Sequence, residues 1–233
     1  HEVAPGSRMQ IGCFDVEWVT LTHSIPEPNA LFIRVAGRTV FHTGDWKLDP
    51  YPIEGDDYDD KRLLALGDSG IEFVVGDSTN ANIEGWSGSE AECRQALLEV
   101  IAKQPNRVAV TCFSSNTARL SSLGDIARET GRRVTVLGRS LFNYLQTAKA
   151  TGYLQSFPDL VPTEDLDYLP RSEQLILATG SQGEPRAAMA RNGDESCGVN
   201  GWQLWTRPSW RRRRGARPRA PRAAPRGRRR RVK

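Results

Sequence analysis

The chain has 233 residues, 38% of them hydrophobic, which is enough for one large domain or two small domains with a buried core. No run of about 18 apolar residues occurs, so the sequence excludes a transmembrane helix and we expect no membrane association. The net charge of +4 is the sum of two parts of the chain with opposite charge. Residues from Arg191 onward hold 15 of the 32 basic residues and 2 of the 28 acidic residues, so the first 190 residues are acidic and the end is strongly basic.

The cysteines and the N-terminus indicate the compartment. Cys13, Cys93, Cys112 and Cys197 are widely spaced and form no CxxC pair. This spacing argues against a zinc knuckle and a disulfide framework, and it is typical of a reducing cytoplasm. The N-terminal "HEVAPGSRMQ" has no basic stretch before an apolar run, so we expect no signal peptide. The lack of an initiating methionine indicates a processed or incomplete chain.

The first part of the chain predicts strands and one short helix. "VEWVTLT" (16–22) combines alternation with β-branched residues and predicts a strand that ends at His23. "ALFIRV" and "TVFHT" flank "AGR", the pattern of a β-hairpin with a three-residue loop, and Asp45 follows its second strand. "DDKRLLALGDSG" (59–70) has apolar residues at helical spacing and ends on glycine, which predicts a short helix.

From residue 71 onward, apolar β-branched runs alternate with helical patterns. The predicted strands are "IEFVV", "RVAVTCF", "RRVTVLG" and "EQLILAT". The predicted helices are "SEAECRQALLEVIAKQ" with Ser89 as N-cap, "LSSLGDIARETG", "SLFNYLQTAKATG" and a start at "PRAAMAR". This alternation indicates a parallel sheet covered by helices.

Polar clusters follow the predicted strands. They are His23, Asp45, Asp77–Asn80, Ser114–Asn116 and Gly180–Gly183. Ligands of parallel sheets collect at the carboxyl ends of the strands, so we expect these clusters to form one site.

His23 and Asp45 are the candidate metal ligands. "GD" after a strand is often only a turn, and a single histidine is more often structural than a ligand. A carboxylate and an imidazole that end neighbouring strands nevertheless suit a divalent metal such as zinc. An aspartate can also bridge two metals about 3.5–4 Å apart, as in two-metal hydrolysis.

Residues after Arg191 break the pattern. The segment lacks apolar periodicity and is dominated by Arg, Pro, Ala and Gly. It cannot bury enough surface to offset the entropy of ordering it, so we expect the tail to be disordered.

Five blocks in order resemble the ribonuclease J family: "THSIPEPNALFIRVAGRTVFHTGDWKLDP", "GDSTN", "TCFSSNTARL", "VLGRSLFNYLQTAKATGYL" and "ATGSQGEPRAAMAR". That family belongs to the metallo-β-lactamase group with an inserted β-CASP domain, and the resemblance runs from about Val16 to Arg191. It implies a two-metal hydrolase of RNA, acting as a 5′-to-3′ exonuclease and as an endonuclease. The cofactor implied is zinc, two ions per complete subunit. The partners implied are 5′-monophosphorylated single-stranded RNA and further copies of the complete protein.

The resemblance also implies roles for single residues. His23 matches a metal-binding histidine, and Asp45 matches a bridging aspartate. Ser114, Ser115 and Asn116 match the stretch that touches RNA near its 5′ phosphate, and a helix start offers N–H groups to an anion. Asp77 matches an acid that orients a metal ligand, although a turn or N-cap role explains it equally well. We interpret "GSQGEPR" as a packing turn.

Two blocks of the family are missing. The upstream "HxHxDH" block, which supplies most ligands and the water-activating acid, is absent, as is the later "SGH" block; the only histidines are His1, His23 and His42. No catalytic residue of that block is therefore present. Two ligands cannot hold two zinc ions, so we expect this chain to bind metal weakly and to cleave RNA poorly.

The fold class predicted is α/β, with three regions. Residues 1–89 belong to a partial metallo-β-lactamase αββα sandwich, residues 90–191 to a partial β-CASP domain, and residues 192–233 to the tail. The tail is either a polybasic RNA-binding arm or an out-of-frame translation of a GC-rich gene, and we favour the frame shift. The alternative functions are a catalytically dead RNA-binding module and a β-CASP nuclease that acts on DNA.

Overall fold

The structure is a computed structural model that describes residues 1–181 and 188. All described residues belong to one compact unit, which lies within His1–Gln203. The predicted tail (192–233) lies outside the described residues, as does the helix predicted at "PRAAMAR" apart from Ala188. Among the described residues, no helix combines the length and the apolar character needed to cross a membrane.

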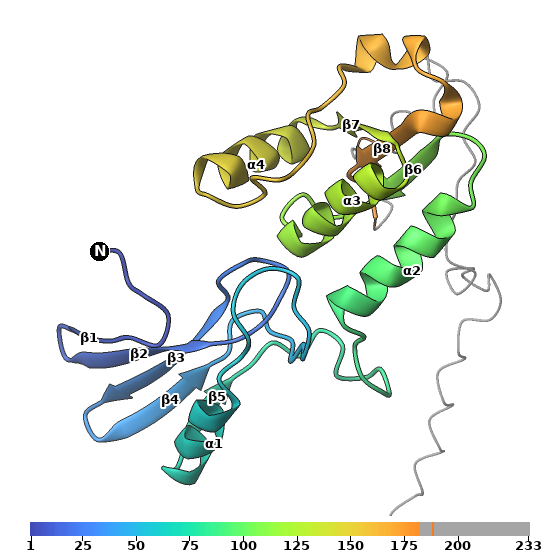
Figure 1. Ribbon diagram of the computed structural model, residues 1–233. Coiled ribbons are helices and arrows are strands. Elements are labelled where there is room, and N and C mark those ends of the chain that lie inside the picture. The colour runs from blue at the N-terminus through green and yellow to red at the C-terminus, as the bar shows by residue number, and fades with distance from the viewer. Residues whose placement is uncertain (182–187, 189–233) are drawn as a thin grey trace, which may run out of the picture. The chain divides into compact units, whose positions relative to one another are not determined.

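A five-stranded sheet forms the first part of the fold (Figure 1). In spatial order its strands are β1 (Arg8–Ile11), β2 (Phe14–Thr20), β3 (Asn29–Val35), β4 (Arg38–His42) and β5 (Phe73–Val75). The pairs are antiparallel except for β5, which runs parallel to β4. Helix α1 (Asp60–Asp68) places Leu66 in a small core with Val19, Leu21, Ala30 and Phe32.

The hairpin of β3 and β4 has a shorter loop than the sequence predicted. Val35 pairs with Arg38, so only Ala36 and Gly37 form the turn. Both have positive φ angles, 48° and 73°, as a two-residue type I′ turn requires. The prediction of three loop residues was wrong because Ala36 adopts a left-handed conformation that alanine disfavours.

A three-stranded parallel sheet forms the second part (Figure 1). Its order is β6 (Val108–Thr111), β8 (Gln174–Ala178) and β7 (Arg133–Leu137). Every residue of the central strand β8 is buried, which accounts for its continuous apolar sequence. The predicted parallel sheet is confirmed for three of its four predicted strands, whereas "IEFVV" forms β5 and pairs with β4 in the first sheet.

Three helices accompany this sheet: α2 (Glu90–Ala102), α3 (Thr117–Glu129) and α4 (Arg139–Ala150). Ser89 caps α2 through a capping box with Glu92, as the sequence predicted for the cap. Helix α3 begins at Thr117 rather than at Leu120, because the Asn116 side chain caps it. Two 3₁₀ helices, η1 (Thr163–Tyr168) and η2 (Arg171–Glu173), were not predicted.

The mixed α/β class is confirmed. The largest core lies in the second part and is built from α3, α4 and the strands β7 and β8, with Leu120, Leu123, Leu141, Leu175 and Leu177 fully buried. Of the expected αββα sandwich, the described residues show one sheet and one helix.

Candidate functional site

His23 and Asp45 are brought together by a short bridge between their segments. Thr22 pairs with Lys47 in an isolated antiparallel bridge, and the Lys47 N–H donates to the Thr22 carbonyl at 2.9 Å. The Thr22 hydroxyl donates to the Lys47 carbonyl and accepts from the Asp49 N–H at 2.8 Å. The residue after Thr22 and the loop before Lys47 therefore lie side by side.

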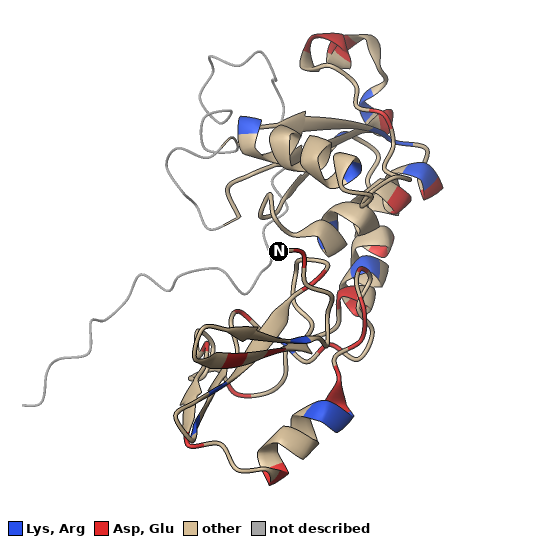
Figure 2. Cartoon of the chain, turned by 90° about the vertical axis from the view of Figure 1, so that its left-hand side faces the viewer, with Lys and Arg blue, Asp and Glu red and all other residues tan. Residues whose placement is uncertain are grey.

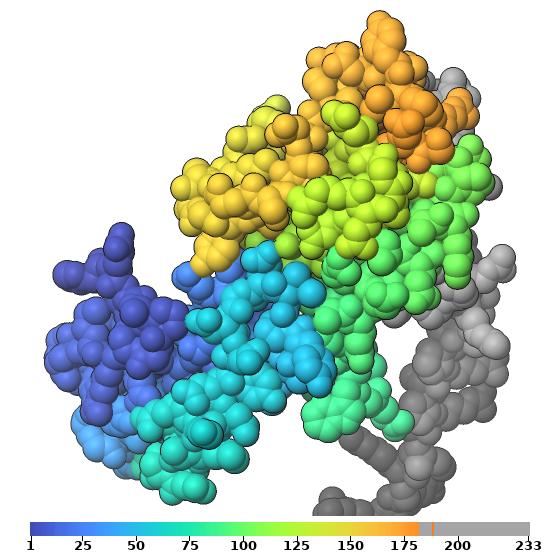
Figure 3. Space-filling model, in the orientation of Figure 1, coloured from blue at the N-terminus to red at the C-terminus, as the bar shows by residue number. Residues whose placement is uncertain are grey.

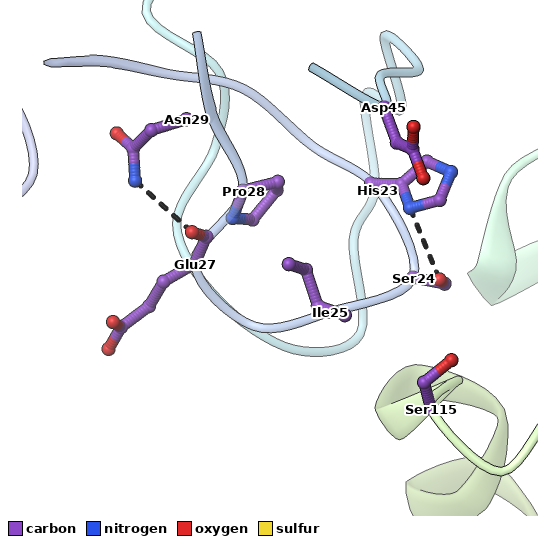
Figure 4. A pocket seen from close by; sticks show the side chains of 8 residues that line it. All are labelled: His23, Ser24, Ile25, Glu27, Pro28, Asn29, Asp45 and Ser115. Atoms are coloured by element: carbon purple, nitrogen blue, oxygen red, sulfur yellow. Dashed lines mark hydrogen bonds between the residues drawn. The ribbon is translucent and has the colours of Figure 1, made fainter. Parts of the chain in front are cut away.

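A pocket of about 310 Å³ contains both candidate ligands (Figure 4). It is lined by His23, Ser24, Ile25, Glu27, Pro28, Asn29, Asp45 and Ser115. Both side chains line this pocket, and the Asp45 carboxylate makes no hydrogen bond with a described residue. The Nδ1 atom of His23 lies 3.2 Å from the Ser24 hydroxyl, so its Nε2 atom stays available for another partner.

Residues 24–28, which form one wall of the pocket, are hydrogen-bonded to the second part of the fold. The Thr117 N–H donates to the Ser24 carbonyl at 2.9 Å, and the Tyr153 hydroxyl donates to the Glu27 carboxylate. This bond raises the pKa of Tyr153 to about 12. The two segments also touch in the space-filling view (Figure 3). These contacts bring Ser115 to the pocket that holds His23 and Asp45.

The stretch Ser114–Asn116 supplies one side chain to the pocket. Ser115 lines it, whereas Ser114 and Asn116 do not. The Asn116 side chain accepts from the Arg119 N–H at 2.9 Å and so caps α3. The N–H groups of Asn116 and Thr117 also have acceptors, in Phe113 and Ser24. The hydroxyl of Ser115 is therefore the group that this stretch offers to a ligand.

Asp77 lies beside the pocket rather than in its lining. Its carboxylate accepts from the backbone N–H of Thr79 at 3.0 Å and from the Thr79 hydroxyl. These bonds, and to a lesser degree the nearby His23, lower the pKa of Asp77. The Trp46 indole donates to the Asp77 carbonyl at 3.0 Å, which ties Asp77 to the loop of Asp45. Asp77 thus forms a local turn next to the candidate ligands.

The described residues do not form a zinc site. No group of three or more His, Cys, Asp or Glu side chains among them is placed to hold a metal ion. His23 and Asp45 supply two donors, and protein zinc sites use three or four. Among the described residues, the donor set therefore does not fit a bound zinc ion.

Asp49 is a positioning residue that the sequence did not reveal. Its carboxylate is 2% exposed and accepts from the N–H groups of Tyr51 and Glu90 at 3.0 and 2.8 Å. Lys47 forms an ion pair with it at 2.9 Å. Burial alone would raise the pKa of Asp49, but the N–H donors of Glu90 and Tyr51, with Lys47 and Ser89, lower it to about 2. Asp49 thereby connects the loop of Asp45 to the start of α2.

Comparison with known proteins identifies the relatives of this chain. Residues 105–197 match the family model described as "Ribonuclease J, beta-CASP domain". The chain is 42% identical over 186 residues to ribonuclease J of Sinorhizobium meliloti, covering 80% of this chain and 33% of that protein. It is 38% identical over 191 residues to ribonuclease J of Thermus thermophilus, covering 82% of this chain and 33% of that protein. The chain therefore spans about a third of the length of these relatives.

One solved structure has a similar fold. A crystal structure of a protein of unknown function from Enterococcus faecalis V583 matches with a TM-score of 0.50 and 19% identity, covering 75% of this chain and 44% of that chain. This likeness concerns the fold alone. The sequence matches show that about four fifths of the chain is similar to ribonuclease J proteins, and that residues 105–197 match the β-CASP domain of that family.

Proposed function

We propose that this chain carries part of the RNA-binding cleft of a ribonuclease, which hydrolyses RNA phosphodiesters in the cytoplasm as a 5′-to-3′ exonuclease and as an endonuclease. The observation that supports this most directly is the pocket where His23, Asp45 and Ser115 meet. These residues come from three separate stretches, each predicted from sequence as part of the site. The names of the relatives support RNA as the substrate class.

Each residue has a distinct role in this proposal. The Ser115 hydroxyl binds a phosphate oxygen at the 5′ end of the RNA, because it faces the pocket and makes no hydrogen bond with any described residue. His23 and Asp45 line the pocket as its two candidate metal donors, and these two donors alone do not hold a zinc ion. Asp49 and Thr22 keep the two donor segments adjacent.

The test is a preference for a 5′ phosphate. Fluorescence anisotropy compares the affinity of the whole chain for one oligoribonucleotide with a 5′ monophosphate or a 5′ hydroxyl. We expect the phosphorylated form to bind more tightly, and we expect Ser115→Ala to reduce this preference by about tenfold or more, the value of a hydrogen bond to a charged group. Residues 192–233 bind both forms alike through charge, so the ratio of affinities removes their contribution.

The control is Ser156→Ala, because Ser156 is exposed and its hydroxyl makes no hydrogen bond with another described residue. This variant should keep the full preference. Equal affinity of the unsubstituted chain for both oligoribonucleotides would contradict the proposed 5′ site. If affinity falls steeply with salt and no 5′ preference exists, the chain is the nonspecific RNA-binding module considered above.

A further inference from the structure

Four arginines gather at the amino edge of the three-stranded sheet. Arg107 precedes β6, Arg132 precedes β7 and Arg133 begins it, and Arg171 begins η2, directly before β8. The strands are parallel, with Val108 opposite Leu175 and Arg133 opposite Gln174, so their starts share one edge. Strand β6 runs from this edge towards Ser115, which places the cluster at the opposite end of the sheet from the candidate pocket.

These arginines differ from most others in the described part of the chain. Figure 2 shows basic and acidic residues close together at several places. Seven other arginines each form an ion pair with a carboxylate: Arg8, Arg34, Arg38, Arg62, Arg94, Arg119 and Arg128. Arg107, Arg132, Arg133 and Arg171 form no ion pair with a described residue. A cluster of cations without carboxylate partners is unusual, because buried charges are normally paired.

Arg132 is accounted for by the fold. It is 6% exposed, and its guanidinium donates to the carbonyls of Asn106 at 3.0 Å, Gln174 at 3.1 Å and Gln104 at 2.6 Å. A longer bond of 3.4 Å reaches the Ile101 carbonyl at the end of α2. Arg132 therefore has a structural role, because it connects the end of α2 and the loop after it to the start of β8.

Arg107 has no such partners. It is 8% exposed, and its Nε atom is enclosed without any hydrogen-bond partner. Its two Nη groups form no hydrogen bond with a described residue either, and they are not among the enclosed unpartnered atoms, so they open to solvent. Burial lowers the pKa of Arg107, as does nearby Arg171, and Asp167 only partly opposes them.

We propose that Arg107 and Arg171 form a phosphate-binding site at the amino edge of the sheet. A guanidinium offers planar, paired donors that match phosphate oxygens, and a phosphate group carries enough negative charge to balance two adjacent cations. The carboxylates of this edge, Asp167 and Glu173, leave Arg107 unpaired within the described residues. The phosphate belongs either to a free phosphate or nucleotide, or to an RNA backbone. This site is independent of the pocket at Ser115.

The experiment measures thermal unfolding of the whole chain in rising inorganic phosphate, with sodium chloride at matched ionic strength as reference. Phosphate at about ten times its dissociation constant should raise the Tm by about 3–6 °C, because it binds only the folded chain. Arg107→Met should lose this rise and should itself have an equal or higher Tm in chloride, since it removes a buried charge that lacks a partner. Arg171→Gln, at an exposed residue, should weaken phosphate binding by about tenfold.

The control is Arg38→Gln, because Arg38 is exposed, is paired with Glu72 and lies on the first sheet. It changes the net charge equally and should respond to phosphate like the unsubstituted chain. The proposal is overturned if phosphate gives no rise beyond chloride, or if Arg107→Met and Arg171→Gln both keep the full rise.

A second measurement identifies the source of the phosphate. In anisotropy with a 5′-hydroxyl oligoribonucleotide, a loss of affinity in Arg107→Met that free phosphate reproduces by competition assigns the site to an RNA backbone. Unchanged RNA affinity, together with loss of the phosphate response, assigns it to a free phosphate or nucleotide. Residues 192–233 are the same in all variants, so their contribution cancels.

Discussion

Asp49 shows how one buried carboxylate orders a loop whose other acid, Asp45, is exposed. Asp49 accepts two backbone N–H groups and pairs with Lys47, whereas the carboxylate of Asp45 has none of these partners among the described residues. The two acids lie four positions apart in the sequence and have opposite roles. One holds the loop, and the other faces the pocket.

The hydrogen bonds of Asp49 predict a pH dependence of stability. The pKa of Asp49 in the folded chain is about 2, against an ordinary value of 3.8. A lowered pKa stabilises the folded state above pH 3.8, and this contribution is lost as the pH falls towards 2. It amounts to about 2 kcal/mol. Urea unfolding of Asp49→Asn at pH 6 should show a loss of about 1–3 kcal/mol, because the amide cannot accept at both oxygen positions.

The comparison across pH separates this effect from general acid sensitivity. Between about pH 4 and pH 2, the unfolding free energy of Asp49→Asn should fall by about 2 kcal/mol less than that of the unsubstituted chain. Asp68→Asn removes an exposed acid with no hydrogen bond to a described residue, and its curve should follow the unsubstituted chain. Parallel curves for all three proteins would show that Asp49 does not titrate as described.

At the scale of residues, the sequence could predict the exposed acid but not the buried one. His23 and Asp45 each follow a strand closely and stand next to turn residues, so a local pattern marked them. Asp49 and Thr22 also have partners 25 to 41 positions away in the sequence, which no local pattern reveals. Asn116 is the opposite case. It belongs to a block that predicted contact with RNA, yet its side-chain oxygen caps helix α3.

Two helical glycines should respond in opposite ways to the same substitution. A Cβ atom at Gly67 in α1 would meet nothing within 4 Å, whereas one at Gly124 in α3 would lie 2.8 Å from the Phe157 ring and 3.1 Å from Pro158. Gly67→Ala should stabilise the chain by about 0.5–1 kcal/mol, because alanine has the higher helix propensity.

Gly124→Ala should destabilise the chain by about 1–3 kcal/mol, because the ring of Phe157 is 6% exposed and has little room to move. Urea unfolding at neutral pH measures both variants, and each serves as the control for the other. A gain in stability for Gly124→Ala like that of Gly67→Ala would mean that Phe157 does not pack against α3 as described.

At the scale of elements, periodicity predicted most strands and helices, and it failed where burial did not follow the pattern. The run "IEFVV" indicated a buried strand, yet Phe73, Val74 and Val75 in β5 are 58%, 65% and 52% exposed. No described element covers this strand beyond its pairing with β4. Strand β1 was not predicted because it is short and largely exposed.

At the scale of the whole molecule, the candidate pocket depends on contacts between regions far apart in sequence. The segment 24–28 follows β2, yet it bonds to Thr117 and Tyr153 in the second part of the fold. Family blocks predicted which residues share a site, whereas the hydrogen bonds that assemble it could not be read from any block. The same residues also limit the metal chemistry, because no three His, Cys, Asp or Glu side chains among the described residues are placed to hold a metal ion.

This donor count predicts weak zinc binding by the chain. Zinc held by two protein ligands is expected to exchange readily, because stable sites use three or four. After gel filtration in zinc-free buffer, we expect well under one zinc ion per chain by elemental analysis, and we expect EDTA to leave the Tm unchanged, since no folding energy depends on the metal. His23→Ala and Asp45→Asn should give the same zinc content as the unsubstituted chain. One or more zinc ions per chain that survive gel filtration and are lost in Asp45→Asn would contradict this prediction, and would require further ligands near the pocket.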